Sequence, residues 1–165
     1  MKRLKILVFD DNENHRKAAG AQLGKKHDLE VVGTYREAEK ALENFDGKTK
    51  LFDAVLTDLL VPPSDRSQTT PTHAGQEMPI GVFIGLAAAV NAGAKHVVVF
   101  TDMNHHNHPA SACLDPFGRT PFMVNGCKVV FSNSPNWMCE HKGQTVKNWA
   151  HALEYILKTP AKTGS

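Results

Sequence analysis

Several acidic residues and one threonine stand directly after short apolar runs at separate places in the chain. These residues are Asp10, Asp11, Asp58, Thr101 and Asp102. Carboxylates that are crowded together raise one another's pKa unless a cation neutralises them. A set of oxygen ligands without nearby Cys or His suits Mg²⁺, which binds a few carboxylates and keeps several waters. A carboxylate shielded in this way can attack phosphorus and form an aspartyl phosphate, so the pattern indicates phosphoryl chemistry if the runs meet in space.

The apolar runs are expected to meet because the chain alternates between strand-like and helix-like segments. Strands are predicted at 5–9, 29–35, 51–58 and 95–102, and helices at 15–26, 36–45 and 80–93. This alternation is typical of βαβ units with right-handed crossovers and a parallel sheet that helices cover on both faces. In such sheets functional groups gather at the carboxyl ends of the strands, where the acidic residues fall.

The regular alternation weakens after Asp102, and other signals define the rest of the fold. A short helix is predicted around residues 110–114. The dipeptide Asn125-Gly126 between two apolar runs predicts a small β-hairpin. Its second arm, at 128–131, is expected to serve as the fifth strand of the sheet. A last helix is predicted before Pro160 from apolar residues at helical spacing, which are Val146, Trp149, Ala150, Leu153, Ile156 and Leu157.

Length and composition favour one soluble domain. The chain has 165 residues, 41% of them hydrophobic and 22% charged, which is enough to bury a core. We expect a single domain over 1–159 and a frayed tail at 160–165. Within the domain we expect an insertion loop at 63–79, after the third strand, which is rich in Pro, Ser and Thr and longer than most loops.

Charge and cysteine content exclude several classes of function. The net charge is +2 and the basic residues are scattered, so no nucleic-acid partner is expected. No apolar stretch reaches the roughly 20 residues that span a bilayer, so no membrane contact is expected. The three cysteines are an odd number without CxxC spacing, which favours reduced thiols in the cytoplasm.

Three stretches of the sequence resemble the receiver domains of response regulators. "KILVFDDNENHRKAAGAQL" is similar to the first strand and helix of that family, "FDAVLTDLLVP" to its phosphoacceptor strand, and "GAKHVVVFTD" to its fourth strand. The resemblance implies a doubly wound, flavodoxin-like α/β fold with a five-stranded parallel sheet in the order 2-1-3-4-5.

The same resemblance implies a role for each matching residue. Asp58 would accept a phosphoryl group from a histidine kinase or a phosphotransfer protein. Asp10, Asp11, Asp58 and the carbonyl of Leu60 would hold Mg²⁺, and Thr101 would bond the phosphoryl oxygen. Such a domain signals by contact with a downstream protein, here unknown, rather than by turnover, and a homodimer is one option.

One position departs from the receiver pattern. Receivers end their fifth strand with a lysine before a proline, whereas this chain has Ser134 before Pro135. Lys128 lies nearby but would need a changed register to reach the site. A degenerate receiver, with the fold and the acidic pocket but without phosphorylation, therefore stays open beside the active form.

Two other interpretations remain. The stretch "VFDDN" resembles the first motif of haloacid-dehalogenase-like phosphohydrolases, with Asp10 as nucleophile. By the same resemblance, Thr101 would supply the hydroxyl of that family's second motif and Lys128 would be its lysine. Separately, imidazole and thiolate groups late in the chain could bind zinc, although their spacing matches no known zinc motif. These groups are His105, His106, His108, Cys113, Cys139 and His141.

Overall fold

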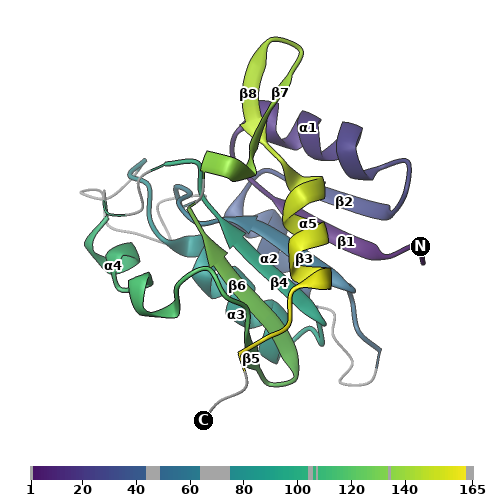
Figure 1. The fold of residues 1–165 in the computed structure, drawn as a ribbon, viewed down its shortest axis with the longest axis vertical. Helices are drawn as coiled ribbons and strands as arrows, with labels where there is room; N and C mark the ends of the chain where they lie inside the picture. The colour runs from purple at the N-terminus through teal and green to yellow at the C-terminus, as the bar shows by residue number, and fades with distance from the viewer. Residues whose placement is uncertain are drawn as a thin grey trace.

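A six-stranded sheet forms the centre of the computed structural model, which describes residues 2–43, 49–63, 75–103, 106, 108–133 and 135–162 (Figure 1). Its strands are β1 (Lys5–Phe9), β2 (Asp28–Val32), β3 (Ala54–Asp58), β4 (His96–Phe100), β5 (Phe122–Val124) and β6 (Cys127–Ser132). The helices are α1 (Glu13–Leu23), α2 (Tyr35–Glu43), α3 (Ile80–Val90), α4 (Pro109–Ala112) and α5 (Trp149–Lys158), with 3-10 turns η4 (Asp115–Phe117) and η5 (Pro135–Trp137). A separate hairpin consists of β7 (Met138–His141) and β8 (Gln144–Lys147).

The predicted α/β class and the mainly parallel sheet are confirmed, but the strand count and order differ. The sheet has the order β2-β1-β3-β4-β6-β5, and five of its strands run parallel. The sixth strand, β5, pairs antiparallel with β6 at the edge. The five-stranded prediction was wrong because it counted only the second arm of this hairpin as part of the sheet.

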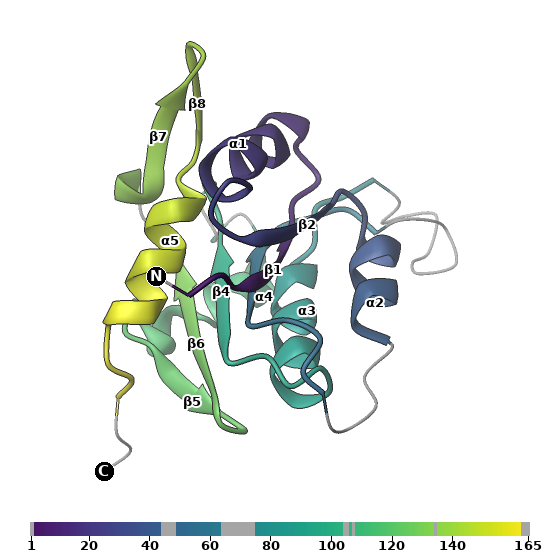
Figure 2. The same ribbon diagram turned by 90° about the vertical axis from the view of Figure 1, so that its right-hand side faces the viewer.

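Helices cover both faces of the sheet (Figure 2). Residues alternate along β1, so that Ile6 and Val8 pack into one core and Leu7 and Phe9 into the other. α1 and α5 cover the first face, and α2 and α3 cover the second, each through buried apolar side chains. These are Ala19 and Leu23 of α1, Trp149 and Ile156 of α5, Ala38 and Leu42 of α2, and Ile84 and Ala88 of α3.

Two hairpins have the same kind of turn. Asn125 and Gly126 have φ angles of 48° and 76°, which confirms the predicted β-hairpin between β5 and β6. Lys142 and Gly143 have φ angles of 51° and 78° and join β7 to β8. The β7–β8 hairpin was not predicted. It projects beyond the central sheet beside α1 (Figures 1 and 2).

The last helix is shorter than predicted at its start. Val146 lies in β8, and the helix begins at Trp149 after Asn148, whose side chain accepts a hydrogen bond from His151 N. Part of the predicted insertion and tail, residues 64–74 and 163–165, lies outside the described residues, as does the end of the helix predicted at 36–45. Within the described parts of the chain, each helix is too short or too polar to traverse a bilayer.

Candidate functional site

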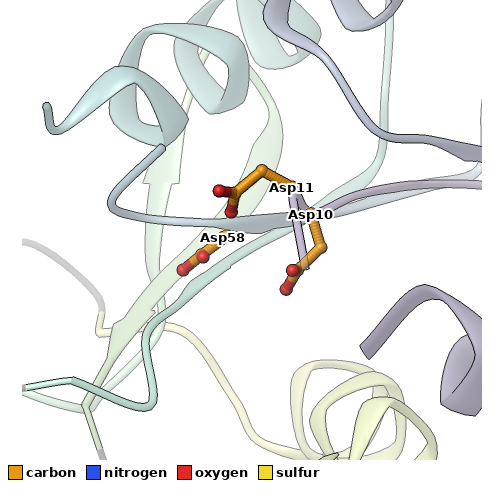
Figure 3. A group of neighbouring side chains, drawn as sticks. All are labelled: Asp10, Asp11 and Asp58. Atoms are coloured by element: carbon orange, nitrogen blue, oxygen red, sulfur yellow. The ribbon is translucent and has the colours of Figure 1, made fainter. Parts of the chain in front are cut away.

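The predicted acidic residues meet at the carboxyl edge of the sheet. β3 lies between β1 and β4, with Phe9 opposite Thr57 and Asp58 opposite Phe100. Asp10, Asp11 and Asp58 each place one carboxylate oxygen within 4.8 Å of the others (Figure 3). The proximity of these side chains follows from the strand register, because each residue stands at or just after the end of its strand.

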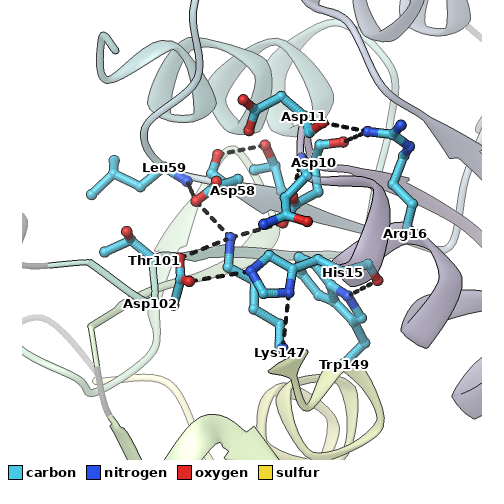
Figure 4. Close-up of polar contacts among 12 residues, drawn as sticks. Asp10, Asp11, His15, Arg16, Asp58, Leu59, Thr101, Asp102, Lys147 and Trp149 are labelled. Atoms are coloured by element: carbon cyan, nitrogen blue, oxygen red, sulfur yellow. Dashed lines mark hydrogen bonds and ion pairs between the residues drawn. The ribbon is translucent and has the colours of Figure 1, made fainter. Parts of the chain in front are cut away.

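Lys147 supplies a cation to this cluster. Its Nζ lies 2.8 Å from Asp10 Oδ2, 2.8 Å from Asp58 Oδ1 and 3.7 Å from Asp102 Oδ1 (Figure 4). The Lys147 side chain is fully buried, and its ammonium also lies 5.6 Å from the ring centroids of Phe100 and Trp149. One buried ammonium therefore connects carboxylates from three strand ends.

The expectation that the acidic cluster lacks a lysine is therefore wrong. Lys128, the alternative considered, lies opposite His96 at the other end of β4, and its Nζ donates to Thr159 O at 2.9 Å. Ser134, which occupies the lysine position of the receiver pattern, lies outside the described residues. The β7–β8 hairpin separates β6 from α5, so the lysine comes from the end of β8 instead of the end of β6.

A local signal for Lys147 exists in the sequence. It stands immediately before Asn148, the N-cap of α5, and after Val146, which is buried. Gly143 marks the preceding turn, and recognition of that turn would have placed Lys147 at the end of a strand. Lysines are rarely buried, so the residue type alone predicts an exposed side chain at position 147.

Burial and charge act in opposite directions on this ion-pair network. Burial raises the pKa of Asp58 to about 7, and Asp10 and Asp102 add to this effect while Lys147 opposes it. For Lys147, burial alone would lower the pKa, but Asp58, Asp10 and Asp102 together raise it. Lys147 is therefore a permanent cation, and the carboxylates around it outnumber it.

Asp10 and Asp11 are held by their own backbone and by Arg16. The Asp10 Oδ1 accepts a hydrogen bond from Asn12 N at 2.8 Å. Arg16 Nη1 donates to the carbonyl oxygens of Asp10 and Asp11 at 2.8 and 2.6 Å. Burial and the nearby charge of Asp10 raise the pKa of Asp11. Arg16 therefore binds the main chain at both residues, and the Asp11 carboxylate lies within 4.8 Å of that of Asp58 (Figures 3 and 4).

The backbone around Asp58 is fixed by α3. Asp58 Oδ1 accepts a hydrogen bond from Leu59 N at 2.7 Å, and Gly81 N donates to Leu59 O at 3.1 Å. A Cβ atom at Gly81 would lie 1.7 Å from the carbonyl oxygen of Asp58. The start of α3 therefore touches the main chain of the site. Leu60, the predicted carbonyl ligand, follows in the same buried turn.

Thr101 lies at the expected place, directly after β4, and is buried. Its N–H donates to Ser132 O at 3.0 Å, and its Oγ1 accepts a hydrogen bond from Met103 N at 3.1 Å. Thr101 thus connects the ends of β4 and β6 beside the acidic cluster.

The acidic cluster could hold a metal ion. Its ligand atoms are all carboxylate oxygens, which suit a hard divalent cation, and the negative charge exceeds that of Lys147. Among the described residues, no other group of three or more potential ligands gathers in this way. His106 instead pairs with Asp115 at 2.9 Å, and His108 Nδ1 accepts from Ala110 N. The predicted zinc alternative thus has no support in the described part of the chain, and His105 lies outside it.

Comparisons of the chain with protein-family models, with curated proteins and with solved structures gave no match. The fold and the geometry of the acidic cluster therefore carry the functional argument.

Proposed function

We propose that this chain is a receiver-like signalling domain in which Asp58 accepts a phosphoryl group. The observation that carries the proposal is the position of Lys147, whose ammonium lies 2.8 Å from both Asp10 and Asp58. The parallel strand order β2-β1-β3-β4-β6 supports a flavodoxin-like arrangement, in which sites form at the carboxyl edge of the strands. A phosphorylation site without a lysine, the degenerate form, is less well supported once Lys147 is in place.

The contacts of Asp58 leave one oxygen for attack. The bonds of its carboxylate to Leu59 N and to Lys147 Nζ both use Oδ1. Attack by Oδ2 would form an oxygen–phosphorus bond while the phosphorus–nitrogen bond of the donor breaks. The electron pair of the broken bond would stay on the donor's histidine nitrogen. The donor would be a histidine kinase or a phosphotransfer protein. Lys147 would stay beside the new phosphoryl group and offset part of its charge.

Asp10, Asp11, Asp58 and the Leu60 carbonyl would hold Mg²⁺ at this site. When bound, the ion would neutralise negative charge on the phosphoryl oxygens. The three carboxylates fit such an ion because each places an oxygen within 4.8 Å of the others and together they carry more negative charge than Lys147 balances. Asp11 is the most exposed of the three carboxylates and is therefore the first that an entering ion meets.

Thr101 would report phosphorylation. Its hydroxyl would turn from Met103 N toward a phosphoryl oxygen on Asp58, and Ser132 of β6 would move with it through their backbone hydrogen bond. A shift of this kind would alter the surface formed by α4, β6 and α5, where a downstream protein, or a second copy of the chain, would bind in the cytoplasm.

The contacts favour Asp58 over Asp10 as the nucleophile. Both carboxylate oxygens of Asp10 are engaged, one with Asn12 N and the other with Lys147, and the side chain is fully buried. Lys128, which a haloacid-dehalogenase-like mechanism would use, bonds at the opposite edge of the sheet.

The test is phosphorylation by acetyl phosphate in Mg²⁺, measured by intact mass. Wild type should gain one phosphoryl group and Asp58→Asn should gain none. Asp53→Asn is the matched control, because Asp53 lies just before β3 and pairs with Lys50 and Lys5 N away from the site. Continuous phosphoester hydrolysis that persists in Asp58→Asn and stops in Asp10→Asn would overturn the proposal. An intact fold without modification would favour the degenerate form.

A further inference from the structure

Lys147 reaches the acidic cluster from outside the central sheet. It is the last residue of β8, which pairs with β7 in a two-stranded sheet, with Lys147 opposite Met138. The ladder hydrogen bonds that fix Asp58 at the end of β3 therefore do not fix Lys147. Another set of contacts must hold its main chain in place.

Two side chains of α1 bind both main-chain polar groups of Lys147. The Lys147 N–H donates to His15 Nδ1 at 3.3 Å, and Gln22 Nε2 donates to the Lys147 carbonyl oxygen at 3.1 Å. His15 and Gln22 lie two turns apart on the same face of α1. The Gln22 Oε1 also accepts a hydrogen bond from Ala150 N at 3.1 Å, so α1 also binds the first turn of α5.

The second ring nitrogen of His15 binds Asp102, a carboxylate that lies beside the ammonium of Lys147. Because Nδ1 accepts a hydrogen bond from Lys147 N, the ring proton is on Nε2, which donates to Asp102 Oδ2 at 3.1 Å. The other oxygen of Asp102 lies 3.7 Å from Lys147 Nζ. One imidazole thus connects the main chain of Lys147 with a carboxylate beside its ammonium (Figure 4).

The main chain of His15 is itself held in place by a buried residue of α5. His15 is buried, and its carbonyl oxygen accepts a hydrogen bond from Trp149 Nε1 at 2.9 Å. Trp149 is fully buried and packs edge-on against Phe100 of β4. The main chain of His15 is therefore tied to the buried core, and both ring nitrogens of His15 have hydrogen-bond partners.

We propose that His15, assisted by Gln22, is a positioning residue that keeps the ammonium of Lys147 between Asp10 and Asp58. His15 does not touch the reacting oxygen of Asp58, and it acts through Lys147 and Asp102. The effect of His15 on phosphoryl transfer rests on the proposed function, whereas its effect on the position of the Lys147 ammonium does not.

Amine labelling of the folded protein, read by mass spectrometry at each lysine, tests the placement directly. His15→Phe removes both hydrogen bonds of the ring and should raise the labelling rate of Lys147 at least about fivefold, because one lost buried hydrogen bond is worth about 1 kcal/mol. The rate at Lys128 should not change. His15→Gln, which keeps one donor and one acceptor, should restore most of the protection.

His27→Phe is the matched control. His27 is a buried histidine just beyond the end of α1, and its Nδ1 accepts from Leu4 N at 3.4 Å, away from Lys147. This variant should leave Lys147 protected. Equal labelling of Lys147 in wild type and His15→Phe would overturn the proposal. If His15→Phe does not fold, Gln22→Met removes the donor to the Lys147 carbonyl and should expose Lys147 in the same direction.

A double-mutant cycle on acetyl phosphate modification tests the route of the effect. His15→Phe should slow phosphorylation in wild type but have no further effect in Lys147→Met, since the two residues act as a unit. Additive effects would show that His15 supports only the fold, and would overturn the positioning role. If wild type is never phosphorylated, the proposed function fails, and the labelling experiment still decides the role of His15.

Discussion

Asp58 Oδ1 lies 2.8 Å from Lys147 Nζ, although one residue ends a strand of the central sheet and the other ends a strand of the separate β7–β8 hairpin. The Lys147 side chain is fully buried and that of Asp58 nearly so. Charges removed from water in this way depend on each other, because a buried charge that loses its partner is costly. Loss of Lys147 would leave both Asp10 and Asp58 without a cation, whereas loss of Asp58 would leave Lys147 paired with Asp10. The two losses should therefore change the free energy of unfolding in opposite directions.

Replacement of Lys147 by Met should lower the free energy of unfolding by about 3–5 kcal/mol at pH 8, because it leaves Asp10 and Asp58 buried without a cation. Urea unfolding without Mg²⁺ measures this loss. Lys128→Met is the control and should cost about 1 kcal/mol, since only its hydrogen bond to Thr159 O is lost. Equal losses in the two variants would contradict the pairing of Lys147 with the acidic cluster.

Asp58→Asn should instead make the protein more stable at pH 8. Burial raises the pKa of Asp58 to about 7, above its ordinary value of 3.8. The folded state thus holds this proton more tightly than the unfolded state. Ionisation of Asp58 therefore costs stability as the pH rises from about 4 to 7, and the full cost is present above pH 7. The gain in unfolding free energy of Asp58→Asn over wild type should be large at pH 8 and small at pH 4.5, without Mg²⁺.

Asp53→Asn should change the free energy of unfolding in the opposite direction and therefore serves as a comparison. Burial of Asp53 is outweighed by its bonds to Lys50 and Lys5 N, which lower its pKa. Its contribution to stability is therefore present above pH 3.8 and is lost as the pH falls through its lowered pKa. Asp53→Asn should lose stability at pH 8. A gain in both variants, or in neither, would contradict the charge balance described for Asp58.

Mg²⁺ should stabilise the folded protein and should require Asp11. At a concentration one hundred times the dissociation constant, an ion that binds only the folded state adds about 2.7 kcal/mol to the unfolding free energy. Asp11→Asn should weaken Mg²⁺ binding at least about tenfold in titration calorimetry, because it removes one of three carboxylate ligands. Asp28→Asn, at an exposed position of β2, should bind Mg²⁺ like wild type. Unchanged affinity in Asp11→Asn would place the ion elsewhere.

The strand ends could be predicted from the sequence because two independent patterns agree there. Apolar runs such as Lys5–Phe9 predict buried parallel strands, and the residues that follow them must share an edge of the sheet. That reasoning brought Asp10, Asp11, Asp58 and Thr101 together correctly. It depends on the local pattern, on one general rule about parallel sheets, and on a strand order that only the resemblance to receiver domains implied.

Lys147 could not be predicted in the same way because its position depends on tertiary contacts. β7 and β8 carry few apolar residues, so neither shows the pattern of a buried strand, and Val146 fits the helical spacing of α5 equally well. The contacts that direct Lys147 inward come from His15 and Gln22, which are distant in sequence. Pairings between distant polar side chains leave no periodic signal in a single sequence.

Gly81→Ala should damage both the fold and the site. The added Cβ atom would lie 1.7 Å from the carbonyl oxygen and 2.7 Å from the carbonyl carbon of Asp58, and both are backbone atoms that cannot rotate away. α3 must then move away from the end of β3. We expect a loss of about 3 kcal/mol in unfolding free energy, at the upper end of what overpacking costs, and a slower phosphorylation of Asp58.

Gly85→Ala separates this effect from the general effect of alanine in a helix. Gly85 lies one turn further along α3, and its added Cβ would lie 3.0 Å from the side-chain methyl groups of Val97 and Val99. Those side chains can shift by a few tenths of an ångström, and alanine favours the helix by about 1 kcal/mol over glycine. Gly85→Ala should therefore change stability by less than about 1 kcal/mol and leave phosphorylation unchanged. If the two alanine variants behave alike in urea unfolding and in the acetyl phosphate assay, the close contact between α3 and Asp58 does not control the site.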